Sequence, residues 1–248
     1  MIPDTTSISI VLPAYNEEKN IAVTVENIVT FFSSKNRAHE IIIVDDGSTD
    51  NTATLSRVLA KKDPAIRLIR HEINQGKGAA VQSGIQSASG DLVFFFDADG
   101  STPIEEIEKL LPFFTAYDVV IGSRYLNNSS ILIKQPWYRV VLGRLGNTLI
   151  QCVLLPGIRD TQCGCKGFTK KAAHTIFSQQ SIKGWGFDME ILALSRALGY
   201  KIKEVAVRWH DAQNRESRLR PMKAALQTLE ELIRIRVRFL VRHYVKPR

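Results

Sequence analysis

The chain has 248 residues, 44% of them hydrophobic, so it can bury the core of one α/β domain with a small extension. Its net charge is +8, and the whole excess lies in residues 201–248, which favours an anionic partner surface for that segment. The sequence lacks the roughly 18 consecutive apolar residues of a membrane span and the basic start of a secretory signal, so we expect neither.

The N-terminal half alternates between two hydrophobic periodicities. Short apolar runs predict strands at residues 7–12, 40–44, 66–70, 91–96 and 118–122. Amphipathic stretches predict helices between them, at residues 17–32, 50–61, 77–89 and 104–113. Strands that alternate with helices are typical of a parallel sheet covered on both faces, with right-handed crossovers.

The pattern is less regular after residue 122. We expect a polar loop at 127–136, a helix within 138–155, a Cys- and Gly-rich segment at 160–169, a helix at 187–198 and an edge strand at 201–207. A polar, charged stretch at 210–220 precedes a long helix at 222–244. We therefore predict a catalytic domain at residues 1–220 and a basic, amphipathic C-terminal helix at 221–248.

Polar clusters follow four of the predicted strands: residues 13–17 (PAYNE), 45–50 (DDGSTD), 97–100 (DADG) and 122–124 (GSR). Ligands of such sheets bind beyond the carboxyl ends of the strands. Each cluster alone is also explained by turn and cap residues. Asp97 and Asp99 form the most specific pair, because two carboxylates that directly follow a buried strand suit Mg²⁺ or Mn²⁺. An ion held there would stabilise a diphosphate leaving group.

The order of these motifs, with GKGAA at 76–80, DTQCGCK at 160–166 and WGFDME at 185–190, resembles the family 2 glycosyltransferases. The later segments resemble the dolichyl-phosphate beta-glucosyltransferase and polyprenyl-phosphate glycosyltransferase branch. The resemblance covers about residues 7–242. It implies a GT-A fold, a mostly parallel sheet flanked by helices, here with a C-terminal amphipathic extension.

The resemblance also implies roles for individual residues. Asp97 and Asp99 would hold the metal, and Ser101 stands where mannose synthases of the family carry a Gln that can join the metal ligands. The nucleotide sugar would contact Pro13, Tyr15, Glu17, Asp45, Asp46, Lys77, Asp97, Ala98 and Asp99.

The acceptor side rests on four cations and one acid. Arg124, Arg139, Lys166 and Arg218 are candidates to bind an acceptor phosphate, although each is also explained as a surface cation. Asp188 would act as general base for a hydroxyl acceptor, whereas a phosphate acceptor is already ionised and needs none. The catalytic candidates are thus Asp97, Asp99, Asp188 and Arg124. The five histidines show no metal-ligand spacing and are interpreted as surface or structural residues.

The predicted C-terminal helix carries an apolar stripe flanked by arginines. Such a helix fits the surface of an anionic membrane. It also fits packing on the catalytic domain or on a second subunit of a homodimer. We expect no binding to nucleic acid, because the sequence contains no recognised nucleic-acid module. The stripe consists of Met222, Leu226, Leu229, Ile233, Val237, Leu240 and Tyr244.

Taken together, these features predict an inverting glycosyltransferase that moves glucose from UDP-glucose to a polyprenyl or dolichyl phosphate. It would act in the cytoplasm, attached peripherally to the cytoplasmic face of a membrane. Alternatives are GDP-mannose as donor, a sugar or protein hydroxyl as acceptor with Asp188 as base, or a scaffold that only binds nucleotide sugar. A sugar-phosphate nucleotidylyltransferase is disfavoured, because PAYNEE lacks the Gly-rich loop that this class needs after its first strand.

Overall fold

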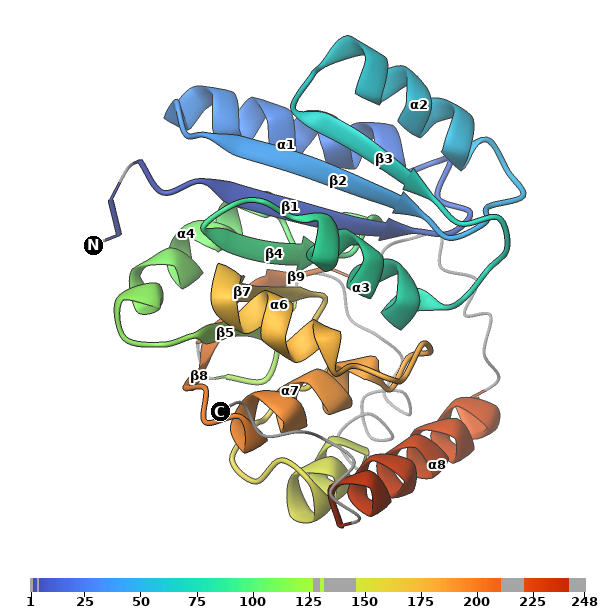
Figure 1. The fold of residues 1–248 in the computed structure, drawn as a ribbon, viewed down its shortest axis with the longest axis vertical. Helices are drawn as coiled ribbons and strands as arrows, with labels where there is room; N and C mark the ends of the chain where they lie inside the picture. The colour runs from blue at the N-terminus through green and yellow to red at the C-terminus, as the bar shows by residue number, and fades with distance from the viewer. Residues whose placement is uncertain (1, 4, 127–129, 132–145, 211–220, 241–248) are drawn as a thin grey trace.

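A seven-stranded sheet forms the centre of the molecule (Figure 1). The computed structural model describes residues 2–3, 5–126, 130–131, 146–210 and 221–240. The strand order is β3-β2-β1-β4-β7-β5-β8, in which β7 runs antiparallel to both neighbours and the other pairs are parallel. The strands are β1 (Ile8–Ala14), β2 (His39–Asp45), β3 (Ile66–Arg70), β4 (Leu92–Phe96), β5 (Val119–Ser123), β7 (Cys165–Thr169) and β8 (Ile202–Ala206). A separate parallel pair consists of β6 (Ser130–Ile131) and β9 (Arg208–Trp209).

Helices cover both faces of the sheet. On β2, Ile42 and Val44 enter one hydrophobic core with α3, α6 and α7, whereas Ile41 and Ile43 enter a second core with α1 and α4. Successive side chains of a strand point to opposite faces, so burial of both faces produces the continuous apolar runs of the sequence. The predicted fold class is thereby confirmed. The helices are α1 (Ile21–Lys35), α2 (Thr52–Lys62), α3 (Lys77–Ser87), α4 (Ile107–Leu110), α6 (Lys170–Ser178), α7 (Phe187–Ala197) and α8 (Pro221–Leu240), with 3₁₀ turns η1 (Ile104–Glu106) and η2 (Leu111–Thr115) beside α4.

Strand β7 lies where the sequence predicted no regular element. It pairs with β4 and β5 in the middle of the sheet, and its residues Cys165, Lys166 and Phe168 have no exposed surface. The run Cys-Lys-Gly-Phe-Thr conceals this position, because a lysine and a glycine are unusual in a buried strand. The lysine is accommodated by an ion pair, described below.

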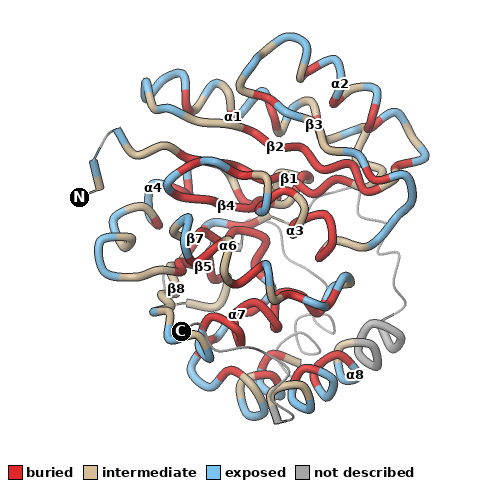
Figure 2. The backbone as a smooth tube through the Cα atoms, viewed as in Figure 1, coloured by how far each residue is buried: buried red, intermediate tan, exposed pale blue. Residues whose placement is uncertain are grey.

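Helix α8 has two apolar faces. Leu232 and Ile235 are buried in the same core as α7, whereas Leu229, Ile233 and Val237 are 41%, 55% and 49% exposed. Figure 2 shows this alternation of buried and exposed residues along the helix. The stripe identified in the sequence is therefore the face that α8 leaves uncovered, as far as its side chains are described. No helix in the described part of the chain is long and apolar enough to cross a membrane. The division into two domains at residue 220 stays a prediction.

The packing of β7 on β4 can be tested at Gly167. A Cβ atom there would lie 2.2 Å from Cε1 of Phe94, so an alanine must displace a buried ring. We expect Gly167→Ala to lower the free energy of unfolding by about 1–3 kcal/mol, measured by urea denaturation. Gly146→Ala is the matched control, because a Cβ atom at residue 146 would meet no other atom within 4 Å. Equal stabilities of the two variants would contradict this packing.

Candidate active site

The four polar clusters meet at one edge of the sheet, as the parallel strands require. Ala14 at the end of β1 pairs with Asp45 at the end of β2, and β4 lies on the other side of β1. The loops that follow β1 and β2 are joined by hydrogen bonds. The backbone N–H of Asn16 donates to Ser48 Oγ at 2.9 Å, and that of Glu17 donates to Thr52 Oγ1 at 2.7 Å. These bonds fix the segment that carries Tyr15 and Glu17, which are both partly exposed, while Pro13 is buried within β1.

The two aspartates after β2 have different surroundings. Asp45 has no exposed surface, accepts a bond from the Ser48 N–H at 3.2 Å and lies 3.1 Å from Arg70 Nε. Asp46 accepts bonds from the backbone N–H groups of Gln75 and Gly76, at 3.0 and 2.8 Å. The Asp46 carboxylate therefore holds the loop that precedes Lys77. Contact of either aspartate with a nucleotide stays a prediction.

His71 completes the support of this loop. Its Nδ1 lies 2.7 Å from Asp46 Oδ1 and its Nε2 lies 3.0 Å from Ser83 Oγ, and the residue is 9% exposed. The interpretation of His71 as structural agrees with this arrangement. Gly76 has a φ of +104°, which an L side chain rarely adopts, so the turn into α3 requires glycine at this point.

Lys77, the first residue of α3, contacts the metal candidate Asp97. Its Nζ donates to Asp97 Oδ1 at 2.5 Å and lies 5.2 Å from the ring centroid of Trp185. Asp97 also lies against Gly164, where a Cβ would come within 2.1 Å of Asp97 Oδ2. The backbone N–H of Asp97 donates to the Gly164 carbonyl at 3.1 Å. The Asp97 carboxylate thus lies between the ammonium group of Lys77 and the backbone of Gly164.

Asp99 lies on the same loop and borders a hollow of about 350 Å³ between α1 and η1. Its Oδ1 accepts bonds from the N–H and hydroxyl of Ser101, whose carbonyl accepts the His210 N–H at 3.0 Å. The hollow is lined by Lys19, Asn20, Val23, Thr24, Asn27, Asp99, Gly100, Pro103, Ile104, Glu105 and His210.

The donor set on this loop fits a hard divalent cation. The two carboxylates offer the oxygen ligands that such an ion prefers, and His210 lines the hollow beside Asp99. The sequence did not predict that His210 lies beside this hollow, because its position next to Ser101 depends on β9 rather than on local spacing. No three described His, Cys, Asp or Glu side chains are grouped as a preformed metal cage. The remaining ligands of a bound ion would therefore be water and substrate oxygens.

Lys166 and Asp188 form an ion pair inside the protein. Lys166 has no exposed surface, and its Nζ donates to Asp188 Oδ1 at 2.5 Å and to the Cys163 carbonyl at 2.6 Å. Burial raises the pKa of the Asp188 carboxyl, although the positive charges of Lys166 and Lys77 oppose that shift. In this arrangement the Lys166 ammonium group is bound to the protein, and its role in binding an acceptor phosphate stays a prediction.

Arg124 is likewise engaged with the protein. Its Nε and Nη2 donate to the two oxygens of Asp160 at 2.8 and 2.9 Å, and its backbone N–H donates to Asp160 Oδ2 at 2.9 Å. Burial opposes ionisation of Asp160, but the charge and hydrogen bonds of Arg124 lower the pKa of Asp160 below its ordinary value. The planar guanidinium of Arg124 and the planar carboxylate of Asp160 thus pair through two hydrogen bonds. We expected this geometry between Arg124 and an acceptor phosphate, but Asp160 is the partner here. Arg139 and Arg218 lie outside the described residues.

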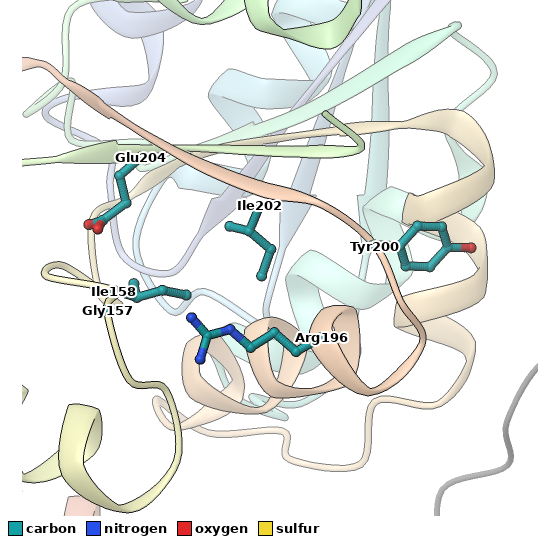
Figure 3. Close-up of a pocket in the computed structure, with 6 residues that line it drawn as sticks. All are labelled: Gly157, Ile158, Arg196, Tyr200, Ile202 and Glu204. Atoms are coloured by element: carbon teal, nitrogen blue, oxygen red, sulfur yellow. The ribbon is translucent and has the colours of Figure 1, made fainter. Parts of the chain in front are cut away.

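A second hollow, of about 200 Å³, is drawn with its lining residues in Figure 3. Its polar side chains already bind the backbone: Arg196 donates to the Pro156 carbonyl at 2.6 Å, and Glu204 accepts the N–H groups of Arg159 and Asp160. None of the described site residues lines it. Glu204 thereby supports the segment that carries Asp160, and we assign no substrate to this hollow. Its lining is Gly157, Ile158, Arg196, Tyr200, Ile202 and Glu204.

Comparison with known proteins identifies the class to which this fold and site belong. Residues 9–177 match the family described as "Glycosyl transferase family 2". The chain is similar to the dolichyl-phosphate beta-glucosyltransferase of Dictyostelium discoideum, with 36% identity over 96% of this chain and 76% of that protein. The human and Saccharomyces cerevisiae proteins of that name are each 32% identical, over 95% and 96% of this chain and 76% of each relative. The chain therefore belongs to glycosyl transferase family 2 and is a glycosyltransferase.

Solved structures support the GT-A fold. Glucosyl-3-phosphoglycerate synthase from Mycobacterium tuberculosis, crystallised with Mn²⁺, UDP and phosphoglyceric acid, aligns with a TM-score of 0.68 at 21% identity, over 93% of this chain and 78% of that one. Mannosyl-3-phosphoglycerate synthase from Rubrobacter xylanophilus aligns with a TM-score of 0.66 at 16% identity, over 96% and 75% of the two chains.

The buried ion pair makes a prediction for stability. We expect Lys166→Met to lower the free energy of unfolding by about 3–5 kcal/mol at pH 7, because Asp188 stays buried without this cation. The folded-state pKa of Asp188 in the variant lies above the unfolded value of about 3.9, so the folded state binds more protons and stability falls as pH rises. The loss of stability in Lys166→Met should be complete above the folded-state pKa of Asp188 and disappear below about pH 4.

Urea denaturation between pH 4 and pH 8 measures this profile. The double variant Lys166→Met/Asp188→Leu removes both charges and should recover most of the stability at pH 7. A double variant as unstable as Lys166→Met at pH 7 would contradict the buried ion pair.

Proposed function

We propose that this enzyme transfers glucose from UDP-glucose to a polyprenyl or dolichyl phosphate, with inversion at the anomeric carbon. The observation that carries the proposal is the 32–36% identity to dolichyl-phosphate beta-glucosyltransferases across almost the whole chain. The loops after β1, β2, β3 and β4 support it, because they bring carboxylates and Lys77 to the edge where such sheets bind nucleotides.

Asp97 and Asp99 would hold Mg²⁺ or Mn²⁺ on this proposal. When bound, such an ion supplies positive charge that stabilises the departing nucleoside diphosphate. Lys77 adds a second positive charge at the same place, since its ammonium group already lies 2.5 Å from Asp97. Trp185 is 49% exposed beside Lys77 and can cover an apolar face of a sugar ring.

A phosphate acceptor fits the state of Asp188 better than a hydroxyl acceptor does. A general base must reach the proton that it removes. Asp188 is 3% exposed and its Oδ1 is occupied by Lys166. An acceptor phosphate is ionised at neutral pH, so its oxygen attacks without a base and the diphosphate leaves from the opposite face of the sugar. Asp188 then orients Lys166 and lies in the field of Lys77.

The lipid acceptor is reached through α8 on this proposal. Leu229, Ile233 and Val237 form an uncovered apolar face, and Arg234 and Arg236 are exposed beside it. Cations near an anionic bilayer contribute about 1 kcal/mol each to binding. The net charge of residues 201–248 favours an anionic membrane over a neutral protein surface as the occupant. We propose that this contact lies at the cytoplasmic face of the membrane.

The reaction is tested by labelled transfer. Purified enzyme is given polyprenyl phosphate, Mg²⁺ or Mn²⁺, and a panel of UDP- and GDP-sugars. A lipid-extractable product with UDP-glucose supports the proposal. Labelling from GDP-mannose would change the donor, and labelling of an added sugar or peptide hydroxyl in place of lipid would change the acceptor and restore Asp188 as the candidate base.

Asp97→Asn should lower kcat/KM for lipid glucosylation by at least about 100-fold, because an amide is a weaker ligand for a divalent cation than a carboxylate. Glu26→Gln is the control, since Glu26 is an exposed acid on α1. Initial rates at several metal concentrations are the measurement. Unchanged kcat/KM in Asp97→Asn would remove Asp97 from the metal site.

Val237→Asp should weaken binding to vesicles that contain phosphatidylserine by about tenfold or more, because it places a charge in the membrane-facing stripe. Val58→Asp on α2 is the control, since Val58 is 45% exposed on another helix. Vesicle co-sedimentation measures the binding. Equal binding of both variants, together with dissociation of a dimer by Val237→Asp alone, would assign the stripe to a subunit interface.

A further inference from the structure

The segment that joins α6 to α7, residues 179–186, contacts both the start of α3 and helix α8. On the α3 side, the Lys183 carbonyl accepts the Ala79 N–H at 3.2 Å. Gln180 Nε2 donates to the carbonyls of Gly78 and Ile182, at 2.9 and 2.8 Å. A Cβ at Gly78 would lie 2.6 Å from the Ile182 carbonyl oxygen, so the two backbones are in close contact. The first turn of α3, which begins with Lys77, is therefore seated on this segment.

Glu190 fixes the shape of that segment. Its Oε2 accepts the N–H groups of Ser181 and Ile182, at 3.0 and 2.7 Å, and its Oε1 accepts the Ser181 hydroxyl. Glu190 has no exposed surface. A carboxylate with three such donors is a strong local anchor, because hydrogen bonds to a charged acceptor are about twice as strong as neutral ones. In the sequence, Glu190 is the last residue of the WGFDME motif at 185–190, and its bonds to residues 181 and 182 follow only from the structure.

Helix α8 contacts the same segment at two points. Arg238 Nη1 lies 3.5 Å from Glu190 Oε1. At Gly186, a Cβ would lie 2.4 Å from Oε2 and 2.9 Å from Cβ of Glu231, so α8 packs directly on this glycine. The residue before it is Trp185, whose ring faces Lys77. Both contacts of α8 thus reach the surroundings of Lys77 without touching the site itself.

We propose that Glu190 is a positioning residue that couples the seating of α8 to the placement of Lys77 against Asp97. The path runs from Arg238 through Glu190 to the backbone of residues 181–183, and from there to the first turn of α3. Because the exposed stripe of Leu229, Ile233 and Val237 lies on the same helix, a partner that engages α8 then sets the geometry of the transfer site. The inference rests on the proposed roles of Asp97 and Lys77 and on the proposed membrane contact of α8.

The first test compares Glu190→Gln with Glu190→Ala. The amide nitrogen of glutamine cannot accept an N–H, so glutamine keeps part of the anchor and alanine keeps none. We expect kcat to fall on the order of 10- to 100-fold in Glu190→Ala, with a smaller fall in Glu190→Gln, because a small displacement of a positioned group is costly. Amide hydrogen exchange should accelerate at residues 76–80 and 181–183 in the same order.

The second test leaves Glu190 intact and disturbs the contact between Gly186 and Glu231 of α8. Gly186→Ala should accelerate exchange at residues 76–80 and lower kcat, with KM for the nucleotide sugar changed less. Gly146→Ala, where the added methyl group meets open space, should behave as wild type. Rates are normalised to folded protein, so that lost stability alone does not count as an effect.

Wild-type exchange at residues 76–80 in both Glu190→Ala and Gly186→Ala would overturn the inference, whatever their stability. Faster exchange with unchanged kcat would overturn it as well, since Lys77 placement would then not matter to the reaction. If the wild-type enzyme glucosylates no lipid phosphate, the proposed function fails. In that case the hydrogen-exchange measurements still decide whether α8 is coupled to the first turn of α3.

Discussion

The ion pair between Lys77 and Asp97 is the contact on which the geometry of the site depends. Asp97 and Asp188 are poorly solvated, and a carboxylate out of water needs a cation close by. The structure alternates the charges, with Lys77 against Asp97 and Lys166 against Asp188. The pKa of Asp188 responds to both lysines and to Asp97, so the four groups form one electrostatic unit. Displacement of any one of them changes the charge that the others experience.

The residues at the start of α3 would destabilise an isolated helix, but they suit an anionic ligand. Its first turn contains no acidic residue, begins with Lys77 and lacks a side-chain cap at Gly76. Acids and polar caps normally stabilise this position, whereas a lysine does not. Tertiary bonds from Asp46 and from the Lys183 carbonyl take over that task. A helix start that carries a lysine and no acid suits the diphosphate of the proposed donor, which an acidic first turn would repel.

The sequence predicted those parts of the fold that local periodicity determines. The five strands of the N-terminal half and the first three helices between them follow from apolar runs and amphipathic stretches, whereas the helix predicted at 104–113 is the short α4 between two 3₁₀ turns. The four loop clusters meet at the sheet edge because parallel strands end together. Strand β7 could not be predicted, since Lys166 and Gly167 are acceptable there only because of Asp188 and Phe94. The partners of Arg124 and Glu190 lie 36 and 8–9 residues away and follow from tertiary contacts alone.

The C-terminal helix illustrates why a sequence stripe leaves two interpretations open. The periodicity of Leu229, Ile233 and Val237 indicates an apolar face but does not say which surface covers it. In the structure, a neighbouring face with Leu232 and Ile235 packs on the domain, and this leaves the stripe uncovered. Packing and membrane contact are therefore compatible, because they use different faces of one helix. Leu232, Ile235 and Arg238 hold the helix on the domain, so its stripe has a fixed orientation relative to the site. On the proposed function, a bilayer bound to the stripe would therefore offer its phosphate groups from a defined side.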